Sequence, residues 1–218
     1  MTSVVTAQRL ADQLELADLL RAGRDRMLEP QDLPGRYGRV IRALDHLLHT
    51  IGSEAVVAGG WAVWRHGYLG RVTQNVDIVV PADAVDELLR AAAVSGFEVF
   101  PLRGGRWPKL RHKESDVDVR ILPEGATPGT ASKPAPTTIP HPSRLGAQAG
   151  VLKYVDLAGL VELKLAAGRA RDDSDVVELV LANPDRVDAV RRHLATVHAH
   201  YVARFDELMV RAREQADR

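Results

Sequence analysis

One aspartate inside an apolar stretch is the first residue of this chain whose position suggests chemistry. Asp77 stands near the start of Val76–Val80, and Asn75 lies two positions before it. Side chains at i and i+2 of a strand share a face, so we expect Asn75 and Asp77 to project together. A carboxylate and an amide oxygen on one face can hold Mg²⁺ against a triphosphate. The stretch therefore predicts a phosphate and metal site.

A pair of glycines precedes this strand. Residues 55–58 are apolar and predict a short strand that breaks at Gly59 and Gly60, and Trp61-Ala62 begins a short helix. Glycines let the backbone approach a ligand closely, and the N–H groups that open a helix attract anions. We therefore expect Gly59 and Gly60 to hold phosphate.

Alternating residues between positions 109 and 122 predict a pair of strands. We expect one strand over 109–113, a turn at 114–115 and a returning strand over 116–122. In this register Arg111 faces Asp118 and Lys113 faces Asp116, and such ion pairs contribute a few tenths of a kcal/mol to about one each. The inward residues of the returning strand would be Val117, Val119 and Ile121, and the outward residues Asp116, Asp118 and Arg120.

Two motifs resemble the nucleotidyltransferase superfamily. The first is Gly59-Gly60-Trp61-Ala62 followed by Arg71-x-Thr73-x-Asn75-x-Asp77-Ile78, where the superfamily has a glycine pair, a helix and an Asp-x-Asp strand. It is most similar to the antibiotic adenylyltransferases and the related transferases of toxin–antitoxin and abortive-infection systems. Asn75 replaces the first acid of Asp-x-Asp. The second motif, within residues 157–176, resembles the lysine-bearing helix, Arg-Asp turn and further acid of the same group.

The resemblance implies Mg²⁺-dependent transfer of a nucleotide from an NTP, with ATP as the expected nucleotide, to a hydroxyl acceptor. The implied catalytic residues are Asp77 and Asp118. The implied metal ligands are Asn75, Asp77 and Asp118, with Asp116 in reserve. The implied nucleotide-binding residues are Gly59, Gly60, Thr73 and Lys164. Alternatively, the two acids of the returning strand form only surface ion pairs, and Lys164 is a surface residue followed by Asp172 or Asp173 as a helix cap.

A basic stretch at 103–113 suggests where an acceptor would bind. Cationic side chains beside an aromatic ring suit phosphates and bases, and Arg106, Trp107 and Arg111 are the candidates. The acceptor itself, whether a small molecule, an RNA or a protein, is left open. Asn75 brings no charge to a metal, so a second hypothesis is a binding module that has lost turnover, as one component of a toxin–antitoxin pair. A third is a purely structural or interaction protein.

The order of predicted strands and helices indicates an α+β fold with an α/β core, a mixed sheet and flanking helices. We expect N-terminal helices at 1–50, the nucleotidyltransferase-like core at 51–122, a proline-rich loop at 123–150 and a C-terminal helical region at 151–218. The loop would be a lid or a plain connector. Finer expectations are a helix at 4–28 with Leu10, Leu14 and Leu20 buried, Asp83 as a helix N-cap, and one long helix over 185–218.

Composition limits the classes of partner. Lys plus Arg and Asp plus Glu number 29 each, so no global charge draws the chain to nucleic acid or a membrane. The absence of cysteine excludes disulfides and thiolate zinc sites and suits a reducing compartment. No apolar run reaches the length that spans a bilayer. We therefore expect a cytoplasmic protein that binds a nucleotide and contacts no membrane.

Overall fold

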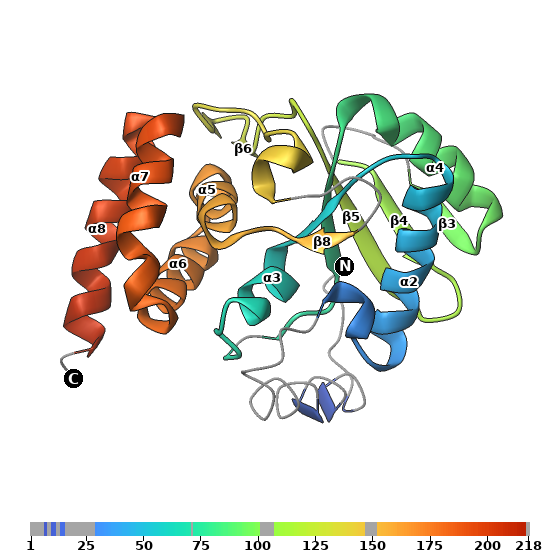
Figure 1. The fold of residues 1–218 in the computed structure, drawn as a ribbon, viewed down its shortest axis with the longest axis horizontal. Coiled ribbons are helices and arrows are strands. Elements are labelled where there is room, and N and C mark those ends of the chain that lie inside the picture. The colour runs from blue at the N-terminus through green and yellow to red at the C-terminus, as the bar shows by residue number, and fades with distance from the viewer. Residues whose placement is uncertain are drawn as a thin grey trace.

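Six strands form one mixed sheet at the centre of the structure (Figure 1). The computed structural model describes residues 29–70, 72–100, 107–146 and 152–216, and positions 7, 10, 11, 14 and 15. The strands of this sheet are β1 (Val56–Ala58), β2 (Val76–Val80), β3 (Phe97–Phe100), β4 (Lys109–His112), β5 (Val117–Pro123) and β8 (Lys153–Tyr154). Their spatial order is β3-β4-β5-β2-β1-β8, parallel at β2–β5 and β1–β8 and antiparallel elsewhere. The predicted α+β fold with a mixed sheet is confirmed.

Helices lie on both sides of the sheet (Figure 1). The α-helices are α2 (Gly35–Thr50), α3 (Gly59–Arg65), α4 (Val85–Val94), α5 (Leu157–Ala167), α6 (Ala170–Ala182), α7 (Val187–Val197) and α8 (Ala199–Ala216). The short 3₁₀ helices are η1 (Pro30–Asp32), η2 (Ala82–Ala84), η3 (Pro142–Leu145) and η4 (Pro184–Arg186). In Figure 1 α2 and α4 lie on one side, and α5 to α8 stand together on the other.

Strand alternation turns Asp77 toward the C-terminal helices. Val76 and Ile78 belong to the apolar cluster that includes α2 and α4. Ala58 and Val79 belong to the second cluster, which includes α5 to α8. Successive side chains of a strand point to opposite faces, and Asp77 pairs with Ala58 across β1–β2. Asp77 therefore shares its face of the sheet with the second cluster.

The returning strand begins one residue later than predicted. Arg111 pairs with Asp118 across β4–β5, so the predicted register is confirmed. The connecting turn is longer than expected, because it covers residues 113–116. The backbone N–H of Ser115 donates to Nδ1 of His112 at 3.3 Å within this turn. Asp116, predicted as the first strand residue, lies in the turn with φ +48° and an exposed side chain.

The prediction of one long C-terminal helix is wrong. The chain leaves helical geometry at His198, whose φ and ψ are −163° and 135°, and α7 and α8 lie side by side (Figure 1). Nδ1 of His198 accepts a hydrogen bond from the N–H of His200 at 3.1 Å and so begins α8. Folding back brings both apolar stripes onto the same cluster, whereas a straight helix of this length would carry one of them away from it. The buried residues of the two stripes are Val190, Leu194, Tyr201, Phe205, Leu208 and Ala212.

The proline-rich segment packs on the C-terminal helices. It contains a two-stranded sheet of β6 (Gly129–Thr130) and β7 (Lys133–Pro134). Ile139, in the same segment, lies buried in the second cluster. The hydroxyls of Thr137 and Tyr201 are 2.8 Å apart. The predicted helix from 151 begins at Leu157, and sequence reasoning missed strand β8 before it.

The expected burial of Leu10 and Leu14 and the expected helix cap at Asp83 need correction. Leu10 and Leu14 are helical but exposed at 41% and 58%, so they do not form the expected buried stripe, and Leu20 lies outside the described residues. Asp83 lies within η2 and does not cap a helix, since α4 starts at Val85 and has no side-chain cap. Pro81 is extended at ψ 143°, and its carbonyl accepts from the N–H of Ala84, which closes the 3₁₀ turn instead.

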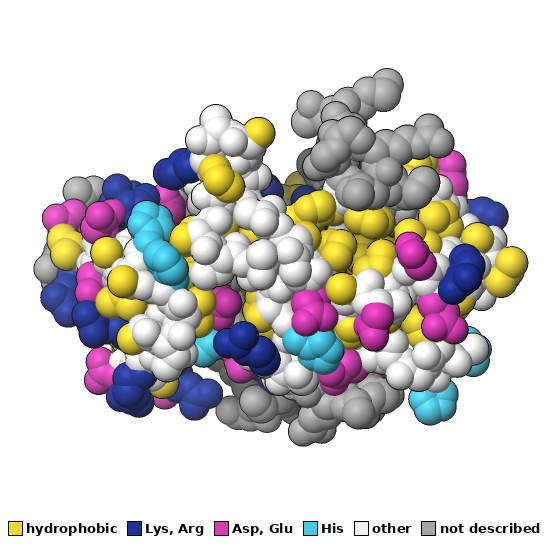
Figure 2. Space-filling view, turned by 90° about the horizontal axis from the view of Figure 1, so that it is seen from above, with side chains coloured by type: hydrophobic (Ala, Val, Ile, Leu, Met, Phe, Trp, Pro, Cys, Tyr) yellow, Lys and Arg dark blue, Asp and Glu magenta, His cyan; other side chains and the backbone are white. Residues whose placement is uncertain are grey.

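On the face shown in Figure 2, acidic and basic side chains are interspersed, in agreement with the balanced totals. Among the helices described, none combines the length and the apolarity needed to cross a bilayer.

We predict that Thr137→Val loosens the proline-rich segment. The buried hydroxyl of Tyr201 would lose its hydrogen bond with the Thr137 hydroxyl and keep the one with the Thr137 backbone, which costs about 1 kcal/mol of the free energy of unfolding. Urea unfolding measures this loss. Thr196→Val is the control, because the Thr196 hydroxyl donates only to a carbonyl on an exposed helix surface, and its loss should be about 0.5 kcal/mol or less. Equal losses for the two variants would contradict the anchoring role.

Candidate active site

The two glycines pack directly against the residues of the candidate site. Gly59 begins α3 with φ +63°, and a Cβ at this position would overlap the Asp77 carboxylate. A Cβ at Gly60 would overlap the side chain of Thr73. Glycine is therefore required twice for close packing, once against the acid and once against the threonine. That the two glycines also hold phosphate stays a prediction.

Asp77 is held by an arginine from the neighbouring strand. Parallel pairing of β2 with β5 places Arg120 directly beside Asp77. Arg120 Nε lies 2.6 Å from Asp77 Oδ1, and Nη2 donates to Oδ2 at 3.0 Å. The Asp77 side chain is 10% exposed and that of Arg120 47%. The carboxylate is thus buried and neutralised, while part of the guanidinium faces solvent.

Asp118 lies on the same face of β5, two residues before Arg120, and is also neutralised. Arg111 Nε donates to it at 2.8 Å and Lys109 Nζ at 3.2 Å. Burial would raise the pKa of Asp118, but the hydrogen bonds and the positive charges of Arg111 and Lys109 hold this pKa below its ordinary value. A carboxylate with a lowered pKa is a weak base. Asp118 therefore fits an ion-pair role at least as well as the predicted catalytic role.

The residues present do not fit a resident Mg²⁺ of the kind that the resemblance implies. Asn75, just before β2, offers no charge, and Asp77 and Asp118 already bind cationic side chains. Mg²⁺ is held by one or two carboxylates together with the substrate's phosphates. Because Asp77 and Asp118 already bind arginine and lysine, the main ligands for Mg²⁺ are occupied. In the described part of the chain, no three acidic or histidine side chains gather into a group that could hold a metal.

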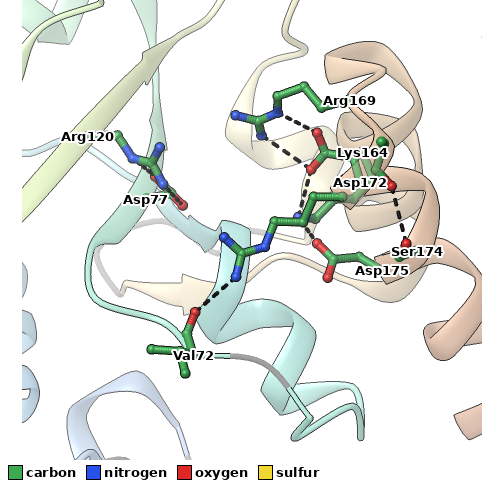
Figure 3. Close-up of polar contacts among 10 residues, drawn as sticks. Val72, Asp77, Arg120, Lys164, Arg169, Asp172, Ser174 and Asp175 are labelled. Carbon is green, nitrogen blue, oxygen red and sulfur yellow. Dashed lines mark hydrogen bonds and ion pairs between the residues drawn. The ribbon is translucent and has the colours of Figure 1, made fainter. Parts of the chain in front are cut away.

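Lys164 lies in a buried ion network, so its interpretation as a surface residue is wrong. Its Nζ lies 3.0 Å from Asp172 Oδ1 and 2.5 Å from Asp175 Oδ2, and all three side chains are at least nine-tenths buried (Figure 3). Arg169 binds the same Asp172 through Nε at 2.6 Å and Nη2 at 3.2 Å. Burial would raise the pKa of Asp172, but the hydrogen bond with Arg169 and the charge of Lys164 hold it below its ordinary value. The predicted contact of Lys164 with a triphosphate stays a prediction.

The start of α6 lies beside the strand motif. Arg171 Nη2 donates to the carbonyl oxygen of Val72 at 3.3 Å. The hydrogen bond with Asp172 is the main cause that raises the pKa of Arg169, and the charge of Asp77 raises it further. Figure 3 shows the Arg169 guanidinium pointing toward the Asp77–Arg120 pair. The two motifs, about a hundred residues apart in sequence, thus meet in space.

The binding of an acceptor by Arg106, Trp107 and Arg111 stays a prediction, and the structure describes two of these three residues. Arg106 lies outside the described residues. Trp107 is half-buried and packs on the second apolar cluster, and Arg111 is engaged by Asp118. Sequence reasoning missed Arg120 and Lys109 as site residues. The alternation of β5 had already placed Arg120 on the face of Asp118, which is the signal that would have found it.

No protein-family model and no curated protein matches the sequence. Solved structures that resemble the chain include two of ANT(2″)-Ia. The crystal structure of ANT(2″)-Ia in complex with adenylyl-2″-tobramycin has a TM-score of 0.44 and 13% identity, over 82% of this chain and 97% of that chain. The solution structure of the antibiotic-resistance factor ANT(2″)-Ia has a TM-score of 0.40 and 14% identity, over 82% and 92%.

We predict that Gly59→Ala destabilises the protein more than Gly52→Ala. Both glycines have positive φ, at +63° and +64°, and alanine in that region costs roughly 1–2 kcal/mol. A Cβ at Gly52 meets open space, whereas at Gly59 it meets the Asp77 carboxylate. Crowding adds about 1–3 kcal/mol at Gly59. Urea unfolding of the two variants measures the difference, and equal losses would show that Asp77 moves aside freely.

We predict that Lys164→Met costs about 3–5 kcal/mol of the free energy of unfolding, because it removes the ammonium that bridges two buried carboxylates, while Asp172 keeps its contact with Arg169. Because the folded protein lowers the pKa of Asp172, this carboxylate stabilises the fold at pH values above its ordinary pKa of 3.8. The stabilisation is lost as the pH falls through the lower pKa of the folded state. Without Lys164 the folded pKa rises and the carboxyl takes up a proton at higher pH. The cost of the substitution should therefore shrink as pH falls from 7 toward 4.

Chemical unfolding at several pH values measures this dependence. Lys153→Met is the control, because Lys153 pairs with Glu29 at a partly exposed site and should lose about 1 kcal/mol or less at every pH. A cost of Lys164→Met that grows as pH falls would contradict the assigned charge network.

Proposed function

We propose that this chain is a nucleotide-binding module with a site of the nucleotidyltransferase type, in which metal-dependent transfer is impaired. The observation that carries the proposal is the Asp77 carboxylate, which packs against Gly59 and is bound by Arg120. The glycine junction and the strand acid lie together as a nucleotide site of this type requires. The acid is nevertheless already bound by an arginine, which competes with a metal for its oxygens.

Charge supports impairment over turnover. Asn75 supplies an amide where the resemblance implies a carboxylate, so one negative charge opposite a divalent cation is missing. Asp118, the expected base, has a lowered pKa and is occupied by two cations. ATP is the nucleotide that we propose, and a module that holds ATP without consuming it suits a component of a toxin–antitoxin pair that acts on a partner protein or RNA.

An active enzyme is the second candidate. It would catalyse Mg²⁺-dependent transfer from an NTP to a hydroxyl of a small molecule, an RNA or a protein. The observation that favours it is the position of Asp118, which lies on the strand next to Asp77 and on the same face of the sheet. An arginine can leave a carboxylate when substrate binds, and this would release Asp77.

The test is a calorimetric titration of the natural chain with ATP, GTP, CTP and UTP, together with amide NMR shifts and a pyrophosphate assay. We expect one nucleotide to bind and to shift the amides of Gly59 and Gly60, while Gly52, on the far side of β1 in the sequence, serves as the unshifted control. We also expect no pyrophosphate above the protein-free rate. A variant with Asn75→Asp and Arg120→Leu should gain Mg²⁺-dependent nucleotide binding, because two carboxylates are then available.

Three results would change the assignment. If no nucleotide binds, or if the shifts lie away from the glycine pair, the proposed site is wrong. Steady pyrophosphate release by the natural chain with Mg²⁺ would establish the active enzyme instead. Failure of the double variant to bind Mg²⁺ and nucleotide, with its fold intact by circular dichroism, would remove the explanation of impairment through Asn75 and Arg120.

A further inference from the structure

Arg120 is fixed in place while part of its hydrogen-bonding capacity stays unused. A guanidinium carries five N–H donors in a rigid fork. The side-on contact with Asp77 uses Nε and Nη2, and no protein acceptor for Nη1 occurs among the residues described. The side chain is 47% exposed. The carboxylate therefore orients the guanidinium, and Nη1 remains available to a ligand.

Arg169 repeats this arrangement from the other side of the site. It also uses Nε and Nη2, here on Asp172, and its side chain is 66% exposed. Asp172 is itself fixed by Lys164 in the buried network. Again Nη1 contacts no acceptor within the described ranges. The guanidinium points toward the Asp77–Arg120 pair in Figure 3, in agreement with the effect of the Asp77 charge on Arg169.

Side-on geometry alone does not distinguish a ligand site from an ordinary ion pair. Arg191 makes the same two-bond contact with Asp206, at 2.8 Å for each bond, on the surface of α7 and α8. The difference at the candidate site is convergence. Two such arginines, one on β5 and one at the start of α6, lie near the same buried carboxylate and beside a glycine junction.

We infer that Arg120 and Arg169 form a phosphate clamp that takes the place of the divalent cation, so that this site binds nucleotide without metal. The inference rests on the proposed nucleotide-binding function. It adds that two arginines, and no metal ion, supply the positive charge that binds the phosphates. Phosphate oxygens beside Asp77 need a positive charge between them and the carboxylate. A guanidinium fork supplies that charge and matches the geometry of phosphate oxygens.

The experiment is calorimetric titration of ATP into the full-length chain, once with excess EDTA and once with Mg²⁺. We expect the dissociation constant to change by about threefold or less between the two conditions. Arg120→Gln and Arg169→Gln should each weaken binding in EDTA by about tenfold or more, since a hydrogen bond to a charged group is lost. Arg191→Gln removes an arginine of the same local geometry away from the site and should leave the affinity unchanged.

The outcomes separate the clamp from the function on which it rests. Binding of ATP only in the presence of Mg²⁺ would overturn the clamp and leave nucleotide binding standing. Absence of ATP binding in both conditions would remove the proposed function together with the clamp. An equal loss for Arg191→Gln would also overturn the clamp, because it would mean that net charge alone attracts ATP. Circular dichroism checks the fold of each variant. Arg120→Lys keeps the positive charge without the guanidinium fork, and we expect it to bind ATP more tightly than Arg120→Gln and more weakly than the natural chain.

Discussion

The ion pair between Asp77 and Arg120 is the interaction on which the rest of the site depends. A buried carboxylate without a partner costs several kcal/mol, so Asp77 can lie against Gly59 only if a cation meets it. Parallel pairing of β2 with β5 puts that cation on the adjacent strand. The pair is therefore positioned by two hydrogen-bonded strands, and no loop has to be ordered to form it.

A second charge network, around Lys164, lies in the helical half of the molecule, and the charge of Asp77 acts on its member Arg169. Lys164 and Asp172 hold α5 to α6, and Arg171 reaches the segment before β2. Further back, Asn183 donates to the carbonyl of His66 at the end of α3. Polar contacts thus link α6 and the residue after it to the end of α3 and to the segment before β2. A ligand that touches Arg120 and Arg169 would contact both halves at once.

Local patterns predicted much of the fold. The apolar strand with one acid, the glycine break and the alternation after residue 109 each depend on near neighbours in sequence, and the register of Arg111 with Asp118 follows from them. Alternation placed Arg120 on the face of Asp118, but its pairing with Asp77 was not predicted, because that depends on which strand lies beside β2. The break at His198 was missed because apolar spacing continues through it, and the burial of Lys164 depends on acids contributed by the following helix.

The edge strand β8 has a consequence for how the chain acquires its structure. It pairs in parallel with β1, and the two strands are about a hundred residues apart in sequence. On the ribosome, β1 to β5 emerge and can pair while the outer edge of β1 still has no neighbour. That open edge is a template for pairing with other chains until β8 is made. The proline-rich segment lies between β5 and β8, so it must be synthesised before β8 can cover the edge of β1. This segment packs on helices that are synthesised later still. The nascent chain is therefore exposed to aggregation until β8 arrives.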